Sequence, residues 1–524
     1  MPKKTLLLLA LASAFSLPLA AEPWVKPDDY GLRADIQLLA DTGVIKAPVT
    51  TYPLMWNSFI DELNDTTLEQ LPSFVQDALL RVKHRYKAEN TEQYNFHSEV
   101  FLSTDTLPAT SFGATNTQKS EATVAYSFLG ESLAGKLAVN YRSDGRKCYL
   151  EGMEQSDIAE DHQALTDCDD ITFDHSYLAY KIGNWVFRAG AVEQFWGPGV
   201  DNSLILTANS KPLQAFSISR EKATAFESAW LSWIGPWSLT TQMAKLESTR
   251  AVPDALLWSS RVNFRPIQQL EVALSWSAQW GGDGKPNSIK DFFEMVSGKS
   301  TCSDGSQDCS NSEKSKLGNQ LAGIDLRWSD TLYSYPYAIY LSTIGEDASS
   351  YFKPADRAYL AGVETTIPFA EQNIKINIEY IDTVVSCSGD ESTPNVQITN
   401  DCYYEHSDYH SGYRYQGRTI GSTFDNDTES LVLTVLGQHR NGNDWQVKLR
   451  QVDYNKDNVD RYPSNPDLGH TITKNAIDST QLELRYRMLA LQGRISFGAL
   501  AAKNKSMGES DTETSAFMKY EMNF

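Results

Sequence analysis

The sequence predicts an all-β transmembrane barrel of about 18 antiparallel strands, with a small N-terminal α-helical bundle on the periplasmic side. Three observations support this. From about residue 95 onward, apolar and polar side chains alternate with a period of two, as they do along strands. The connections between the expected strands are alternately short and long. The last expected strand alternates up to its aromatic end at Phe524, as in bacterial outer-membrane barrels.

The 524-residue chain is acidic, with 46 Lys and Arg residues against 67 Asp and Glu residues and a formal net charge of −21. We therefore expect no binding to nucleic acid, because a phosphate backbone needs basic side chains to displace its counterions. After the N-terminus, no run of the sequence approaches the ~18 to 20 unbroken apolar residues of a membrane helix. The composition thus excludes a helical membrane protein.

Residues 1–21 are predicted to be a secretory signal peptide. A charged start with Lys3 and Lys4 precedes the apolar run 6–19, and small residues follow up to Ala21. This order of charged, apolar and small residues is the pattern of such a signal. With the barrel pattern, it predicts export to the outer membrane of a Gram-negative bacterium.

Between residues 22 and 92 the hydrophobic periodicity is helical. Three short apolar stripes begin near Leu32, Trp56 and Val75, and the first of them stops at Gly43. A spacing of three and four residues places each stripe on one helix face. We expect a small periplasmic bundle that caps the barrel and has a structural role.

The remaining chain, 93–524, is assigned to the barrel and its long extracellular loops. The eighteen expected strands are 95–103, 121–129, 133–142, 171–181, 184–193, 226–234, 237–246, 257–265, 269–279, 319–328, 335–344, 358–367, 373–382, 429–439, 443–453, 478–488, 491–502 and 514–524. Short periplasmic turns and long extracellular loops alternate in such barrels. Segment 194–225 is long and rich in apolar residues, so we treat it as one loop that folds inward. A strand at 214–220 would break the alternation.

Six cysteines fall in three close couples, all in expected long loops. The predicted disulfides join Cys148 with Cys168, Cys302 with Cys309, and Cys387 with Cys402. Nearest-neighbour pairing is one of the 15 pairings that six cysteines allow. No couple has the C-x-x-C spacing of a zinc site, so an oxidising compartment is expected.

The sequence contains no catalytic motif of the common hydrolases or nucleotide-binding enzymes. It has no G-x-S-x-G, H-E-x-x-H or Walker run, and its eight histidines are scattered. His406 and His410 would suit a metal only on a helix, and they fall in an expected loop. We predict that the protein is not an enzyme and has no cofactor or bound metal.

An aromatic and basic cluster lies in the expected loop between Cys402 and Thr428. The candidate carbohydrate-binding residues are Tyr403, Tyr404, Tyr409, Tyr413, Arg414, Tyr415 and Arg418. Aromatic faces pack against the C–H faces of sugars, and guanidinium groups bind hydroxyls and carboxylates. An alternative is that these tyrosines belong to an interfacial aromatic belt and pack the loop.

Three parts of the sequence resemble the Wzi-type capsule assembly family. They are the start at 22–25 with the helix that follows it, the run Q-F-W-G-P-G at 194–199, and the run Y-R-Y-Q-G-R at 413–418. The family motif residues in the second run are Trp196, Gly197, Pro198 and Gly199. The resemblance implies an eighteen-stranded outer-membrane barrel with a periplasmic helical bundle. It also implies a lectin-like role in holding exported capsular polysaccharide.

We predict a non-enzymatic protein that binds capsular or exopolysaccharide and helps attach it to the cell surface. The expected partners are this polymer and the outer-membrane lipids, and the protein is expected to be a monomer. The alternative is a porin for small solutes. It is favoured by charges of both signs on the predicted lumen face, among them Arg261, Asp325 and Lys448.

Overall fold

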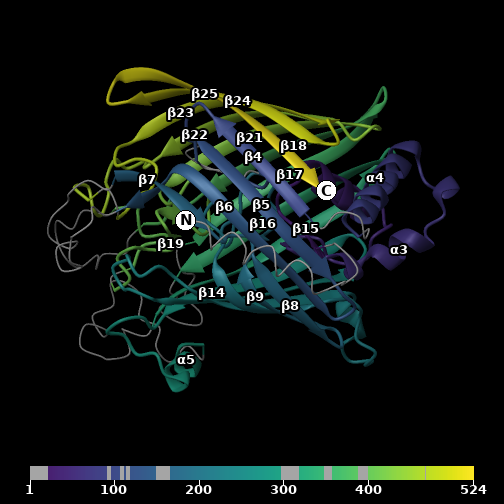
Figure 1. Cartoon of the computed structure of the whole chain (residues 1–524), viewed down its shortest axis with the longest axis horizontal. Helices are drawn as coiled ribbons and strands as arrows, with labels where there is room; N and C mark the ends of the chain where they lie inside the picture. Colours follow the sequence, from purple (N-terminus) through teal and green to yellow (C-terminus); the bar gives the residue numbers. More distant parts are fainter. Residues whose placement is uncertain are drawn as a thin grey trace, which may run out of the picture.

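The computed structural model describes most of the chain. The described residues are 22–90, 96–106, 111–113, 118–148, 166–296, 318–346, 357–386, 399–406, 408–465 and 468–523. Within them the chain forms a closed antiparallel barrel with helices at one end and long connections at the other (Figure 1). The predicted signal peptide, 1–21, lies outside the described residues.

The barrel wall is built from strands that pair in sequence order. They are β4 (Phe96–Ser103), β5 (Ser120–Leu129), β6 (Leu133–Cys148), β7 (Thr166–Thr172), β8 (Tyr177–Ile182), β9 (Trp185–Ala191), β11 (Gln214–Arg220), β12 (Trp237–Lys245), β13 (Leu256–Ile267), β14 (Leu270–Trp280), β15 (Asn319–Leu332), β16 (Tyr335–Glu346), β17 (Arg357–Phe369), β18 (Gln372–Asp382), β21 (Thr428–His439), β22 (Asp444–Tyr454), β23 (Ile477–Ala490), β24 (Gly493–Ser506) and β25 (Glu509–Asn523). The last strand, β25, closes the barrel on β4. Because β7 and β8 both pair with β6, they form one interrupted strand. The described wall therefore has eighteen strand positions, which confirms the predicted fold class.

One predicted strand is wrong. Residues 226–234 form no strand but a connection that contains the short 3-10 helix η4 (Ser232–Ile234), and the strand at this place is β11. The aromatic pattern was misleading because Trp230 and Trp233 are 87% and 64% exposed in that connection and pair with no neighbouring strand. Segment 194–225 is therefore not a single loop. The connection that enters the lumen is 192–213, and the long connection 221–236 at the short-turn end is an exception to the alternation of short and long connections.

Strand β13 illustrates how the sequence builds the wall. Leu257, Ser259 and Arg261 are buried and face the lumen, while Leu256 before them and Trp258 between them face outward. Successive strand residues point to opposite faces, so an apolar-polar alternation gives a lipid-facing exterior and a polar interior. Short turns join the strands at one end, which we call the short-turn end, and the other is the long-loop end.

The N-terminal segment closes the short-turn end. Its elements are β1 (Trp24–Val25), α2 (Tyr30–Asp41), β2 (Thr51–Tyr52), β3 (Leu54–Met55), η1 (Trp56–Ser58), α3 (Ile60–Asp65), η2 (Leu68–Gln70) and α4 (Ser73–Glu89). Helix α2 is enclosed by the wall: Asp29 before it binds Arg487 and Arg494 at 2.6 and 2.8 Å, and Asp41 at its end binds Arg327 at 2.5 Å. Helix α4 packs on α2, and α3 and α4 lie at the barrel end (Figure 1).

The described helices are short. None of them is long and apolar enough to cross a membrane. The remaining described elements are β10 (Phe195–Trp196), α5 (Ile289–Val296), β19 (Arg414–Tyr415) and β20 (Arg418–Thr419).

Candidate functional site

Two connections fill the long-loop half of the lumen. We call residues 192–213 the first plug loop and residues 399–427, of which all but residue 407 are described, the second plug loop. Every residue of the first plug loop except Lys211 is buried. The loops contact each other, because the Thr207 amide donates to the Ile420 carbonyl at 2.9 Å and the Tyr404 hydroxyl donates to the Leu204 carbonyl at 2.6 Å. The plug is therefore one packed unit.

The first plug loop wraps around a carboxylate of the wall. Glu379 on β18 accepts hydrogen bonds from the backbone amides of Val200, Asp201 and Asn202 at 2.5, 3.2 and 2.9 Å. Successive amides that converge in this way form an anion-binding concavity. A Cβ at Gly199 would lie 2.2 Å from the Asn202 carbonyl oxygen, so this tight turn requires glycine.

The same loop is tied to a second wall strand by charge. Asp201 binds Lys448 at 2.6 Å and Arg450 at 3.0 Å, both on β22, and Asp201 and Lys448 side chains are fully buried. On its other side, Arg33 of α2 donates to the Gly199 carbonyl at 2.5 Å. The four family motif residues, 196–199, are all buried. They thus lie where the plug, the wall and the N-terminal helix meet.

The predicted carbohydrate-binding residues lie in the second plug loop, but most of them are inside the plug. Exposed fractions are 0–1% for Tyr403, Tyr404, Tyr409 and Tyr413 and 4% for Arg414 and Tyr415. The tyrosine hydroxyls are used internally: that of Tyr413, for example, donates to Ser277 at 2.8 Å. In this structure the buried rings cannot stack on a polymer. Their placement agrees with the alternative that they pack the loop.

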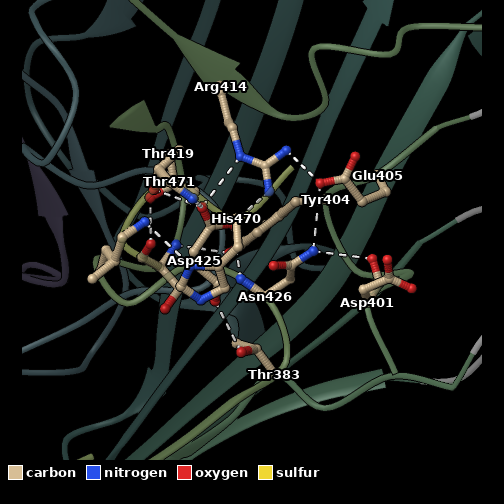
Figure 2. Close-up of polar contacts among 12 residues, drawn as sticks. Thr383, Asp401, Tyr404, Glu405, Arg414, Thr419, Asp425, Asn426, His470 and Thr471 are labelled. Carbon is tan, nitrogen blue, oxygen red and sulfur yellow. Dashed lines mark hydrogen bonds and ion pairs between the residues drawn. The ribbon is translucent and has the colours of Figure 1, made fainter. Parts of the chain in front are cut away.

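Arg414 is the centre of a buried ionic cluster (Figure 2). Its guanidinium binds Glu405 at 2.5 Å and Asp425 at 2.7 Å. Thr471, from the connection between β22 and β23, donates its hydroxyl to Asp425 at 2.6 Å and its amide at 2.7 Å. We call Arg414, Glu405, Asp425 and Thr471 the Arg414 cluster. It joins two connections of the long-loop end through charged hydrogen bonds, which are the strongest kind in proteins.

The two carboxyl groups have opposite net pKa shifts, although burial raises the pKa of both. For Asp425, burial alone would raise the pKa, but Arg414 and the Thr471 donors outweigh burial and hold that pKa well below its ordinary value. For Glu405, burial is only partly offset by Arg414 and raises the pKa to about 7. Asp425 is therefore the fixed anion of the Arg414 cluster.

His470 lies beside the Arg414 cluster, and its shifted pKa predicts that the stability of the connection between β22 and β23 depends on pH. Burial lowers the pKa of His470 to about 4, and its Nδ1 accepts from the Ile472 and Thr473 amides, both at 3.2 Å. The pKa of His470 is about 4 when the connection between β22 and β23 is closed and about 6.5 when that connection is opened. Between these two pH values, His470 is protonated in the opened connection but not in the closed one. Its stability therefore falls as the pH drops through this window.

We expect hydrogen exchange at the Ile472 and Thr473 amides, corrected for intrinsic rates, to accelerate as the pH falls from 6.5 to 4. The reason is that protonation of His470 stabilises the opened connection. The variant His470→Asn keeps an acceptor but does not titrate, so it should lose this acceleration. The raised pKa of Glu405 has the opposite effect on stability as the pH falls, and it is present in both proteins. Equal pH dependence in both would contradict the role of His470.

The Y-R-Y-Q-G-R run forms the β19–β20 hairpin. Its strands are buried, while Gln416 and Gly417 at the turn are exposed. The Arg250 side chain donates to the Arg414 carbonyl at 2.9 Å and to the Gly412 carbonyl at 3.0 Å, which anchors the hairpin on the connection between β12 and β13. Arg418 is half-buried. The hairpin therefore presents its turn and part of Arg418 to solvent.

Two further predictions concern cysteines and metals. Cys402 forms a disulfide, and Cys148 and Cys168 lie on the paired strands β6 and β7. The other three cysteines lie outside the described residues, and the three predicted pairings stay predictions. Within the described ranges, no three His, Cys, Asp or Glu side chains are grouped so that they could hold a metal ion.

A closed barrel with an apolar exterior, whose lumen is filled by its own connections, defines a plugged outer-membrane barrel. The family model of the capsule assembly protein Wzi matches residues 89–513. The chain belongs to this family, as the resemblance of its motifs predicted, and is an outer-membrane protein.

Two known proteins are similar to this chain over most of its length. An uncharacterized 55.8 kDa protein in the cps region of Klebsiella pneumoniae is 28% identical over 364 residues, which are 69% of this chain and 66% of that protein. The match thus spans slightly less than two thirds of the curated relative. The solved structure of Wzi from Escherichia coli superposes with a TM-score of 0.74 at 25% identity and covers 97% of this chain and 99% of that one. That protein is described as a carbohydrate-binding β-barrel involved in group 1 capsule assembly.

Proposed function

We propose that this protein is a non-enzymatic, lectin-like protein that binds capsular or exopolysaccharide and holds it at the cell surface as a monomer. The observation that carries the proposal is the Arg414 cluster, whose ion pairs at 2.5 and 2.7 Å cross-link the second plug loop internally. A preorganised surface binds a polymer with a smaller loss of conformational entropy. The carbohydrate binding of the Escherichia coli relative supports the same function.

The proposed contact surface is the exposed rim formed by the second plug loop and by the connection between β22 and β23. His410 is exposed, and its Nδ1 lies 2.6 Å from the Tyr462 hydroxyl, with the rings edge to face at 6.0 Å. Gln416 and Gly417 are exposed at the hairpin turn. Aromatic faces pack on sugar rings, and imidazole and amide groups bind hydroxyls. The buried tyrosines and Arg414 then act by holding this rim in place.

The function is tested in the strain that produces the polymer. Deleting the gene is expected to release polysaccharide into the medium without lowering total synthesis, and wild-type protein should restore retention. Tyr462→Ala should restore it only partly. The control is Tyr333→Ala, because Tyr333 is 88% exposed in a turn at the opposite end of the barrel. Unchanged cell-bound polymer after deletion would refute the function.

The alternative function, a porin, was suggested by the charged residues on the predicted lumen face. The lumen charges named above are paired: Arg261 binds Asp325 on the wall, and Lys448 binds Asp201 of the first plug loop. Paired lumen charges hold the plug instead of lining water. This pairing favours the polymer-binding function over a porin.

A further inference from the structure

We propose that helix α5 is an interfacial helix that lies in the outer leaflet of the membrane, with its free face in contact with lipid acyl chains at the headgroup boundary. The helix lies in the connection between β14 and β15, at the long-loop end (Figure 1). The inference does not depend on polysaccharide binding. It depends only on the outer-membrane location.

One face of α5 packs on the outside of the barrel. The Phe292 ring lies 5.5 Å from the Trp258 ring and 5.1 Å from the Trp280 ring, and Met295 is fully buried. Trp258 faces outward, since its neighbours along β13 are the buried, lumen-facing residues. The helix therefore covers the exterior of β13 and β14 and continues the lipid-facing surface of the wall.

The adjoining face of α5 is also apolar, but it is exposed. Ile289 is 77% exposed and Phe293 is 63% exposed, and a spacing of four residues places them on one side. Lys290 and Glu294 lie beside them and form an exposed ion pair at 3.6 Å. Apolar side chains flanked by a charged edge are the pattern of a helix in the plane of a membrane interface.

The depth of α5 fits this boundary. Strand β14 runs from Leu270 at the short-turn end to Trp280 under the helix. Ten steps at ~3.3 Å per residue and a tilt of ~40° span roughly 25 Å along the membrane normal, which equals the height of the apolar band of such barrels. Trp280 and the helix that covers it thus lie at the outer edge of the band.

The start of α5 is capped locally. The Ser288 hydroxyl accepts from the Asp291 amide at 3.2 Å, and the Asp291 carboxylate accepts from the Ser288 amide at 2.9 Å. These reciprocal bonds satisfy two backbone donors. Eight residues offer far less area than the ~1,200 Å² of a stable protein interface, whereas the surrounding lipid is already in contact with the adjoining wall.

The proposal is tested by placing a polarity-sensitive fluorophore on Phe293→Cys in full-length protein reconstituted in phospholipid vesicles. Quenchers at the headgroup end of the acyl chains should quench this probe strongly, and aqueous iodide should quench it weakly. Lys290→Cys is the matched control and should show the reverse order. Unmutated protein serves as the blank for labelling of natural cysteines.

A Phe293 probe as accessible to iodide as the Lys290 probe, and insensitive to lipid quenchers, would overturn the proposal. Folding of each variant is checked by heat-modifiable migration on gels. As a second readout, Phe293→Asp should fold but lose the lipid quenching of a probe at Ile289→Cys. Failure of this test leaves polymer retention untouched, so the two proposals are distinguished.

Discussion

Replacing Arg414 with Ala is expected to destabilise the long-loop end of the barrel by about 3–5 kcal/mol, because the change leaves buried carboxyl groups without their cation. Glu405 and Asp425 are 4% exposed or less, and neither can reach water without opening the second plug loop. The strands of the wall do not depend on this contact. We therefore expect loops cleaved by protease at lower denaturant concentrations in a barrel that still migrates as folded.

Two matched variants define this result. Arg414→Lys keeps the charge but cannot bind Asp425 with two nitrogens, so an intermediate effect is expected. Arg440→Ala removes a pair with Asp77 in which the Arg440 side chain is 70% exposed, and such pairs contribute about 0–1 kcal/mol. Equal protease resistance of Arg414→Ala and Arg440→Ala would show that the Arg414 cluster does not hold the loop. Cell-bound polymer should fall with Arg414→Ala and not with Arg440→Ala.

Replacing Asp201 with Ala is expected to unlock the first plug loop. Lys448 and Arg450 would lose the anion that ties this loop to β22, and Lys448 would remain as a fully buried cation. Removing one partner of a buried pair costs about 3–5 kcal/mol. In planar bilayers the wild-type protein should be closed, whereas Asp201→Ala should show opening steps.

The control for this measurement is Asp511→Ala, because Asp511 is exposed on β25 and its loss should leave the barrel closed. Steady, large conductance of the wild-type protein would instead support the porin alternative. A closed Asp201→Ala channel would mean that the nest of amides around Glu379 is sufficient to hold the plug.

The wall could be predicted from sequence because alternation reports which face of a strand meets lipid. Strand β18 is an example: Ile374, Ile376 and Ile378 alternate with polar residues, and the strand was placed within one residue. A strand at 214–220 was excluded because, together with the expected strand at 226–234, it would break the alternation of short and long connections, and the local pattern of β11 was too weak to outweigh that rule. This strand has seven residues, and its lumen side carries only small side chains such as Ser217 and Ser219. The more aromatic connection that follows it imitated a strand, although its tryptophans lie outside the ladder.

The candidate site was predicted in its location but not in its exposure. Tyrosines and arginines near residue 410 suit sugars by type, yet their burial depends on a loop about 200 residues earlier. The Tyr404 hydroxyl, for example, donates to a backbone carbonyl, that of Leu204, and sequence patterns cannot identify such an acceptor. The sequence could not identify Lys448 as the ion-pair partner of Asp201 either, because Lys448 is one of many charged residues on the predicted lumen face.

The location of α2 has a consequence for biogenesis. This helix precedes every wall strand in the chain, but its ionic partners Arg327, Arg487 and Arg494 are on β15, β23 and β24. During synthesis, the Asp29 and Asp41 carboxylates therefore have no ion-pair partner until the strands that carry these arginines have been delivered. Helix α2 can therefore form all its ion pairs only after β24 has been delivered, and a product truncated before β23 cannot form those of Asp29.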